Sequence, residues 1–296
     1  GKWEMATKYW TGGANDNTFS TAANWSDSAT PANGDVLVFA NNPSSGVDYI
    51  GGGDYSGFGS CTLVVGPNWS GNLGTINTAL KLKLTKVEYS GQGDTVHLEA
   101  HSTVTTTEVS ISDTGAGTMP FRLIGTNTIT LLRVTDAKST VQIAGPRTVT
   151  TVDVIGASRP AVVDMIYFGT VSGTTARVSG GTLKIKGDYT NCEVSGQGLL
   201  EVSGTAEIST LDIYGGTCKW NTEGTTSGVS SRLAVYNGSF DATECVATTS
   251  SISNTDLYAS GSIDERNGLE GIDWDGGITV SGGSLSLDPG RVITVD

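Results

Sequence analysis

The chain has 296 residues and a net charge of −13, because 17 lysines and arginines stand against 30 aspartates and glutamates. Glycine is frequent at 41 residues, hydrophobic residues make up 37% of the chain, and charged residues make up only 16%. This hydrophobic content excludes a disordered chain, and the shortage of basic residues argues against nucleic acid or an anionic membrane as a partner. We expect a folded, glycine-rich, all-β protein.

The sequence contains no segment typical of a membrane span or a secretory signal. No run of about 20 apolar residues occurs, and residues 1–5 lack an apolar core, so we expect a soluble chain. The cysteines are too few and too scattered for a disulfide framework, and no C-x-x-C pair indicates zinc. They are predicted to be reduced core residues: Cys61, Cys192, Cys218 and Cys245.

Residues 1–60 are predicted to form an N-terminal capping or docking module. They contain half of the six tryptophans, including Trp10 and Trp25, and they lack the repeat found further along the chain. The Pro31–Asp35 turn and the apolar run Val36–Phe39 predict a hydrophobic plug that leads into the first strand. Trp10 and Trp25 therefore have two interpretations, packing in the core of the cap or docking on a partner.

Three segments of this cap form a recognisable pattern: Tyr9–Gly13 (YWTGG), Phe19–Ser26 (FSTAANWS) and Pro31–Phe39 (PANGDVLVF). The pattern resembles the start of repeat-rich bacterial β-helical proteins, which include autotransporter passengers and surface adhesins. It is also similar to tailed-phage virion proteins that open with a Met-Ala-x-x-Tyr-Trp-x-Gly-Gly run. The resemblance covers residues 5–39 and implies a capping module, not an activity.

The glycine-rich segment Gly51–Gly59 is predicted to be a loop between the cap and the repeats. It lacks the Gly-Lys-Ser/Thr sequence of a phosphate-binding loop, and no helix is predicted after it. Its two aromatic residues, Tyr55 and Phe58, are expected to be exposed. Together with Trp10 and Trp25, they are the candidates for contact with a partner.

The only two histidines fall in one short segment. On a strand, His97, Glu99 and His101 point to one face at steps of about 7 Å. Ligands of one metal ion lie about 2.0–2.2 Å from it, whereas side chains along one strand diverge. The sequence therefore favours an exposed polar face and assigns no metal. Metal binding by this row at a trimer axis is the alternative.

Residues 61–296 carry a repeat that predicts stacked coils. Each unit has two apolar positions separated by one residue, then glycine or a similarly permissive residue, then another apolar position. The second apolar position, named the anchor, is occupied by Val178, Val194, Ile213, Val235, Leu257 and Val280. The positions two residues before the anchors hold Ala176, Cys192, Leu211, Leu233, Thr255 and Ile278. The positions five residues after them hold Leu183, Leu199, Cys218, Phe240, Ser262 and Leu285, with Ile263 next to Ser262.

The spacing of the anchors favours a solenoid. It is about 20 residues, whereas a β-sandwich shows turns every 8–12 residues. The repeat also returns upstream, where Glu88–Gly93 matches Glu193–Gly198 at five of six positions. With Tyr89 as an anchor, about four further turns fit before Val178. We predict an all-β fold, a right-handed parallel β-helix (β-solenoid) of about ten coils over residues 61–296. The alternative is a β-sandwich.

Two acidic segments, Asp264–Asn267 and Asp273–Gly277, flank an insertion between the last two coils. Paired carboxylates can hydrolyse sugars or bind calcium, but these spacings match neither an EF-hand nor the calcium-binding nonapeptide repeats. A solvated turn is favoured. Because no Ser-His-Asp, Cys-His or carboxylate pair can be placed on one face, we predict no catalytic residue, no cofactor and no enzymatic activity.

The expected function follows from the resemblance of the cap. It is a structural protein of a tailed-phage virion, in first place a capsid decoration (cement) protein. As a homotrimer it binds the major capsid protein or other virion subunits after assembly in the host cytoplasm. The alternatives are a bacterial surface or secreted β-helix adhesin and a glycan-binding tail fibre or tailspike component.

Overall fold

The chain folds as a right-handed parallel β-helix of about ten coils, which confirms the predicted solenoid against the sandwich. A computed structural model describes residues 5–43, 49–112, 119–156, 161–222, 228–245, 250–266 and 272–287. The chain divides into two compact units, residues 1–169 and 170–296, and each is described by itself. Within the described residues the only helices are the short 3-10 turns η1 (Ala22–Asn24) and η2 (Ser56–Phe58).

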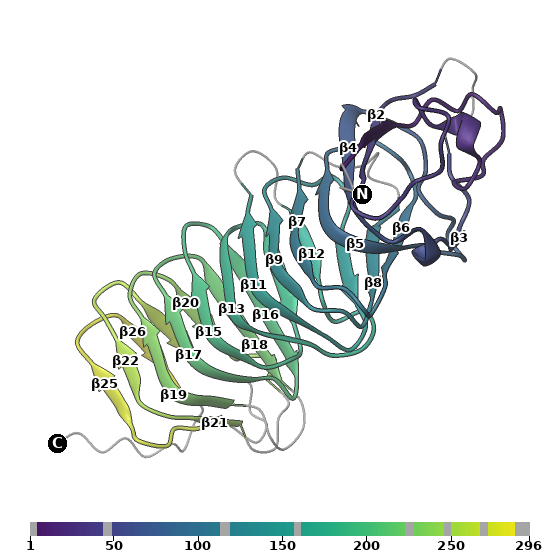
Figure 1. The fold of residues 1–296 in the computed structure, drawn as a ribbon. Helices are drawn as coiled ribbons and strands as arrows, with labels where there is room; N and C mark the ends of the chain where they lie inside the picture. Colours follow the sequence, from purple (N-terminus) through teal and green to yellow (C-terminus); the bar gives the residue numbers. More distant parts are fainter. Residues whose placement is uncertain are drawn as a thin grey trace. The chain divides into compact units, whose positions relative to one another are not determined.

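The first unit contains two parallel sheets, named sheet 1 and sheet 2 (Figure 1). Sheet 1 consists of β1 (Thr7–Tyr9), β2 (Val36–Asn41), β4 (Ser60–Asn68), the second half of β5 (Leu80–Tyr89), β7 (Thr106–Ile111), β9 (Ile129–Val134) and β11 (Arg147–Ile155). Sheet 2 consists of β3 (Gly53–Asp54), the first half of β5, β6 (Val96–Ala100), β8 (Phe121–Gly125), β10 (Val141–Ala144) and β12 (Val162–Asp164).

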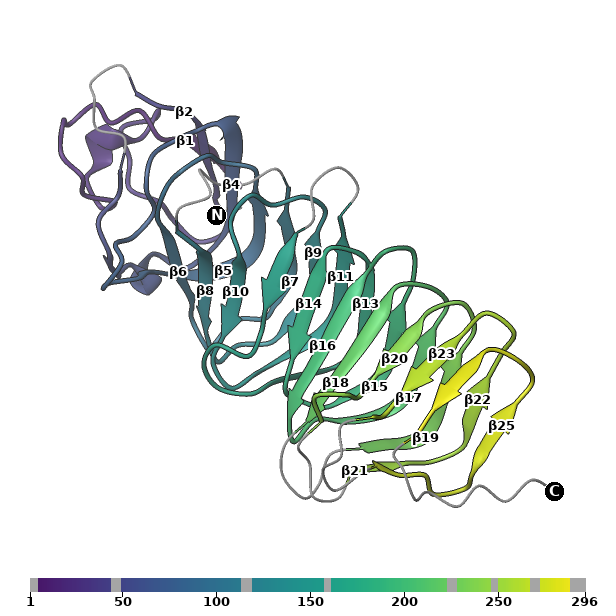
Figure 2. The same ribbon diagram turned by 180° about the vertical axis from the view of Figure 1, so that it is seen from behind.

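The second unit repeats this arrangement, and Figure 2 shows its strands from behind. Its sheet 1 consists of β13 (Val171–Gly180), β15 (Tyr189–Val194), β17 (Glu207–Ile213), β19 (Gly228–Val235), β21 (Ser250–Ile252), β22 (Thr255–Leu257), β24 (Ile272–Asp273) and β25 (Ile278–Val280). Its sheet 2 consists of β14 (Thr182–Ile185), β16 (Leu199–Gly204), β18 (Thr217–Thr222), β20 (Ser239–Asp241), β23 (Ser262–Asp264) and β26 (Ser284–Ser286).

The register of sheet 1 in the second unit confirms the predicted anchors. They follow one another from coil to coil as Val178, Val194, Ile213, Val235, Leu257 and Val280. The column two residues earlier is in register in the same way. From Val178 to Leu257 every member of both columns is at most 2% exposed. Because side chains alternate along a strand, these columns point inward and stack into a continuous core.

The same register holds upstream, in the first unit. The predicted anchor Tyr89 is in line with Ile111, Val134 and Val154. The four cysteines are buried and form no disulfide, as predicted. Burial raises the pKa of the Cys61 thiol to about 12, so this residue behaves as a core side chain.

One predicted core position is wrong by a single residue. Leu183 pairs with Leu200, which is 1% exposed, and not with Leu199. The corner before β16 is one residue longer than the corner before β14. It contains Gly198, whose place no other residue type could take without a clash, because a Cβ atom there would lie 2.4 Å from the Val178 carbonyl oxygen. The coil therefore lengthens in a glycine-containing corner while the core column stays in line.

The cap takes part in the parallel ladder from its first strand. Because β1 pairs with β2 and β2 pairs with β4, sheet 1 already begins at Thr7. The expectation that residues 1–60 lie outside the coil pattern is therefore wrong for β1 and β2. Long connections that contain η1 and η2 replace the short glycine corners and hide the repeat. The expected hydrophobic plug is present. The centroid of the Trp10 ring lies 5.3 Å from that of Trp25 and 5.8 Å from that of Phe39.

Candidate binding surfaces

The four aromatic residues predicted to contact a partner pack within the cap. Trp10 and Trp25 are 5% and 1% exposed, and the Trp25 Nε1–H donates a hydrogen bond to the Phe19 carbonyl oxygen at 2.9 Å. Tyr55 and Phe58 are half-buried instead of exposed, because both rings lie against Phe19. The tryptophans therefore serve the core, and docking through them does not fit the structure.

His97, Glu99 and His101 make three different contacts, and that of His101 is with the Thr103 hydroxyl, 2.9 Å from its Nδ1. The His97 Nδ1 lies 3.0 Å from the Thr75 carbonyl oxygen, whereas Glu99 pairs with the Lys81 ammonium at 3.2 Å. Strand β6 ends one residue before His101, so this histidine belongs to the following turn and not to the row. Among the residues that the structure describes, no group of three or more His, Cys, Asp or Glu side chains is arranged to hold a metal ion.

The connection between the two acidic segments is held by a buried carboxylate, Glu265. Glu265 is 1% exposed and accepts hydrogen bonds from the Ile272 N–H at 2.9 Å and from the Trp274 Nε1–H at 3.0 Å. Residues 267–271, including the predicted Asn267, lie outside the described part of the chain. Glu265 thus joins the two sides of this connection, as a structural turn requires.

Outward side chains of both units pair across neighbouring coils. Cross-strand partners of opposite charge are Lys81–Glu99 (3.2 Å), Arg177–Glu193 (4.0 Å) and Lys184–Glu201 (3.0 Å). In the acidic connection Asp264 forms a bidentate pair with Arg266, and this pairing holds the pKa of the Asp264 carboxyl below its usual value. Such exposed pairs are screened by solvent and contribute little to stability. They order the outer faces and require no ligand.

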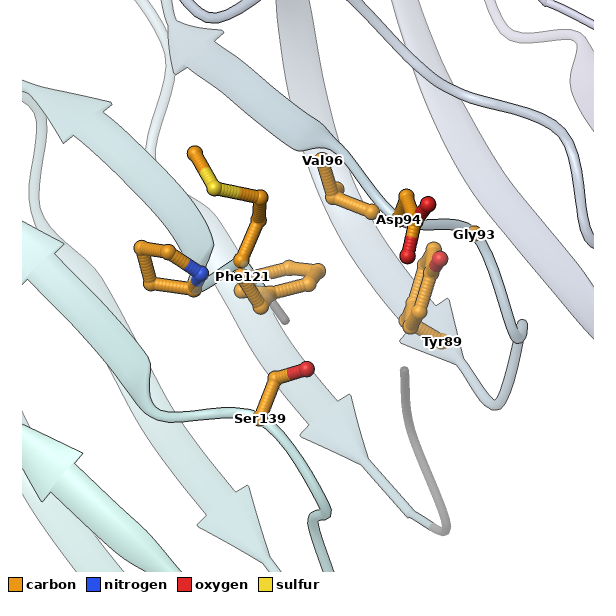
Figure 3. A pocket seen from close by; sticks show the side chains of 8 residues that line it. Tyr89, Gly93, Asp94, Val96, Phe121 and Ser139 are labelled. Atoms are coloured by element: carbon orange, nitrogen blue, oxygen red, sulfur yellow. The ribbon is translucent and has the colours of Figure 1, made fainter. Parts of the chain in front are cut away.

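A pocket in the first unit is shown in Figure 3. It is lined by Tyr89, Gly93, Asp94, Val96, Met119, Pro120, Phe121 and Ser139. The Tyr89 and Phe121 rings meet edge to face at 5.0 Å, and burial raises the pKa of the Tyr89 hydroxyl. The pocket leaves no room for a water molecule. It is a packing feature and not a ligand site.

The first unit carries exposed apolar and aromatic side chains near this pocket. Ile76 and Tyr167 are each 54% exposed, and Phe168 is 65% exposed. Ile76, Met119, Pro120 and Arg122 line one shallow depression, and the Arg122 guanidinium lies 5.1 Å from the centre of the Tyr167 ring. We name these residues, with Phe168 included because it follows Tyr167 in the chain, the apolar patch: Ile76, Met119, Pro120, Arg122, Tyr167 and Phe168.

The second unit carries three stacked tyrosines, named the tyrosine ladder: Tyr214, Tyr236 and Tyr258. Each follows an anchor of sheet 1 and donates its backbone N–H to the anchor carbonyl of the previous coil at 2.8–2.9 Å. The rings are stacked and nearly parallel. The Tyr214 and Tyr236 ring centroids are 4.7 Å apart with an interplanar angle of 9°, and those of Tyr236 and Tyr258 are 4.5 Å apart with an angle of 8°. Their strands β17, β19 and β22 follow one another in Figure 1.

Neither surface is among the sites predicted from the sequence. The tyrosine ladder can be predicted from the sequence, because a tyrosine follows the anchor in three consecutive repeats. The apolar patch has no such signal, since Ile76, Met119 and Tyr167 come from irregular connections of different coils. Only the folded coil brings them together.

No family model, curated protein or solved structure matches this chain. Within the described ranges, no helix is long and apolar enough to cross a membrane. Function is therefore inferred from the fold, from the cap motif and from the two surfaces.

Proposed function

We propose that this chain is a non-enzymatic structural protein of a tailed-phage virion that decorates the capsid. In this role it binds the major capsid protein or other virion subunits as a homotrimer. The observation that carries the proposal is the apolar patch, where Ile76, Tyr167 and Phe168 are each more than half exposed. Exposed apolar groups of this kind mark interaction sites in soluble proteins.

The composition of the apolar patch is typical of a protein–protein contact. Aromatic residues, methionine and arginine are enriched at the centres of interfaces. The patch combines Tyr167 and Phe168 with Met119, and the Arg122 guanidinium lies over the Tyr167 ring. The Arg122 Nε–H also donates to Gln142 Oε1 at 3.0 Å, which orients the guanidinium before a partner arrives.

The fold suits a role that depends on contact area. Each coil is stabilised by its neighbours, so the β-helix is a firm support for a docking surface. Many copies on a regular capsid lattice gain avidity without any new contact. The phage assignment itself is supported by the resemblance of residues 5–39 to the start of β-helical virion proteins.

Quantitative mass spectrometry of purified phage particles from the source tests the location. We expect copy numbers comparable to those of the major capsid protein. A few copies per particle would contradict decoration and indicate a tail component. Absence from the particle would overturn the virion assignment and favour a surface adhesin.

The docking surface is tested with the double variant Tyr167→Ser, Phe168→Ser. Its binding to particles that lack the chain is measured by co-sedimentation, and the matched control is Tyr49→Ser, which removes an exposed tyrosine outside the apolar patch. Because aromatic interface residues often contribute 2 kcal/mol or more, we expect the double variant to bind at least about tenfold more weakly. Unchanged binding would exclude the apolar patch as the docking surface.

A further inference from the structure

Small hydroxyl residues border the tyrosine ladder on both sides. Ser195 and Ser281 donate their backbone N–H groups to the anchor carbonyls of the previous coils at 2.9 and 2.8 Å. They therefore hold the positions that Tyr214, Tyr236 and Tyr258 hold in the coils between them. The ladder has two end rings, and each is next to a serine.

The end ring of Tyr214 has one face that no neighbour in its column can cover. Its other face stacks on Tyr236 at 4.7 Å, yet Tyr214 remains 46% exposed. The Ser195 side chain extends only one atom beyond Cβ, which is too short to shield a ring. Tyr258, at the opposite end, is half-buried. The open aromatic face therefore lies at the step between β15 and β17.

Charged side chains surround this step. Glu193 and Asp212 are directly opposite each other in the register of sheet 1. Asp212 accepts a 2.6 Å hydrogen bond from Arg232, and Glu193 lies 4.0 Å from Arg177. The charge of Asp212 and then partial burial raise the pKa of Tyr214, with a smaller contribution from Glu193. Asp212 stands two residues before Tyr214, so both side chains point to the outer face, and Glu193 is the register partner of Asp212 in the previous coil.

An open aromatic face beside carboxylate and guanidinium groups matches the chemistry of a sugar ring. The C–H groups of a pyranose face carry partial positive charge and are attracted to the negative face of an aromatic ring. Its hydroxyls donate to carboxylates and accept from guanidinium groups. We propose that Tyr214, Glu193 and Asp212 bind a neutral hexopyranose unit of a glycan.

The surroundings favour a neutral sugar over other ligands. Carboxylates on a chain of net charge −13 repel phosphate groups and acidic polymers. A protein partner needs about 800 Å² on each side, whereas the ladder offers one ring face and the edges of two further rings. The proposal does not depend on a virion location, because the same site serves a protein of the cell surface equally well.

The ladder behind Tyr214 prepares the ring for binding. The Tyr236 ring, whose centroid lies 4.7 Å from that of Tyr214, restricts the rotation of the Tyr214 side chain. A ring that is already fixed loses little conformational freedom when a ligand stacks on it. This is the role of Tyr236 in the proposed site.

The test is an NMR titration of the full chain labelled with carbon-13 in its tyrosine rings. The probes are tetrasaccharides of glucose, galactose, mannose and N-acetylglucosamine at millimolar concentration. We expect at least one probe to shift the Tyr214 ring signals with saturation. Variants that lack Tyr214 are followed through the ring signals of Tyr236, which stacks on it. Tyr214→Ser is expected to bind this probe at least about tenfold more weakly. The variant retains the fold because serine occupies the same position in neighbouring coils.

Two further variants separate the open ring from the ladder as a whole. Tyr214→Phe keeps the ring face and is expected to bind within about threefold of the natural chain. Tyr258→Ser removes the opposite end ring and serves as the matched control, with a change below about threefold. Absence of a saturable shift with all four probes would overturn the proposal. Binding by Tyr214→Ser at natural strength, or equal loss in Tyr258→Ser, would overturn it as well.

Discussion

The column that follows the anchors of sheet 1 differs between the two units. In the first unit it holds Ser90, Ser112 and Thr135, and in the second it holds Tyr214, Tyr236 and Tyr258 between Ser195 and Ser281. Backbone bonding is the same, since all of them donate N–H to the anchor carbonyl of the previous coil at 2.8–3.0 Å. The Ser90 and Thr135 hydroxyls also donate hydrogen bonds to these carbonyl oxygens, at 3.0 and 3.4 Å. The tyrosine rings stack on one another instead. Outward columns can therefore change without altering the coil.

The largest expected effect concerns the inward columns that both units share. Leu211→Ala in the second unit and Leu132→Ala in the first remove side chains that are 0% exposed. Each variant is expected to lose about 2–5 kcal/mol of unfolding free energy, because a cavity remains in a filled core. Denaturant titration followed by circular dichroism measures the loss. The outward variant Tyr214→Ser is the control, and a loss of similar size there would contradict the separation between inward and outward columns.

The second-largest expected effect is a loss of stability at the glycine corners, where neighbouring coils approach closely in both units. A Cβ atom at Gly145 (φ +104°) would lie 2.1 Å from the Gly125 carbonyl oxygen, and one at Gly216 (φ +70°) would lie 2.2 Å from that of Gly198. Gly145→Ala and Gly216→Ala are each expected to cost about 1–3 kcal/mol in thermal or chemical unfolding. Gly57→Ala is the matched control, because a Cβ atom there meets nothing within 4 Å. Equal stability of all three variants would refute the close approach of the coils.

A graft tests whether the first unit can accept the ladder of the second. We expect the double variant Ser112→Tyr, Thr135→Tyr to change the unfolding free energy by less than about 1 kcal/mol, because both side chains lie on the outer face. Stacking of the new rings is measured as an added near-ultraviolet circular dichroism signal. Ser112→Tyr alone is the control without a stacking partner. A severe loss of stability would show that the two columns are not equivalent.

The smallest effect is a shift in the titration of Tyr214. Its pKa lies above the ordinary value of 10.0, first because the Asp212 charge disfavours the phenolate. Removing this charge in Asp212→Asn favours the phenolate, so the pKa of Tyr214 is expected to fall toward 10.0. An NMR titration of the ring carbons measures the change. Asp273→Asn, an exposed carboxylate in the same unit, should leave the titration unaltered.

The inward side of the fold could be predicted from the sequence. Apolar residues at every second position, followed by glycine, define the anchors from Val178 to Val280, and the register confirms each of them. The corner at Gly198 could not be predicted in length, because one inserted residue leaves the local pattern intact. The sequence pattern therefore predicts Leu199 at the core position that Leu200 occupies in the structure. The cap strands β1 and β2 were missed because their connections are long.

The outward side could be predicted only in part. The ladder follows from the anchors, since Tyr214 is the residue next to Ile213 and the same offset gives Tyr236 and Tyr258. Its open end depends on Ser195 in the preceding coil, which matters only once the register is known. Tyr55 and Phe58 carry no periodic signal that separates a loop on the surface from one that packs on Phe19. Burial of such residues is a property of the tertiary fold.

Glu265 has a consequence for how foreign peptides can be displayed on this protein. Its buried carboxylate binds the Ile272 N–H and the Trp274 indole, and so closes the base of the connection that contains residues 267–271. On either side the strands keep their register, with Ile263 opposite Leu285 and Leu257 opposite Val280. An epitope inserted within residues 267–271 would be held at its base by this clamp while the coils stay aligned. The connection is thus a suitable insertion point for antigen display.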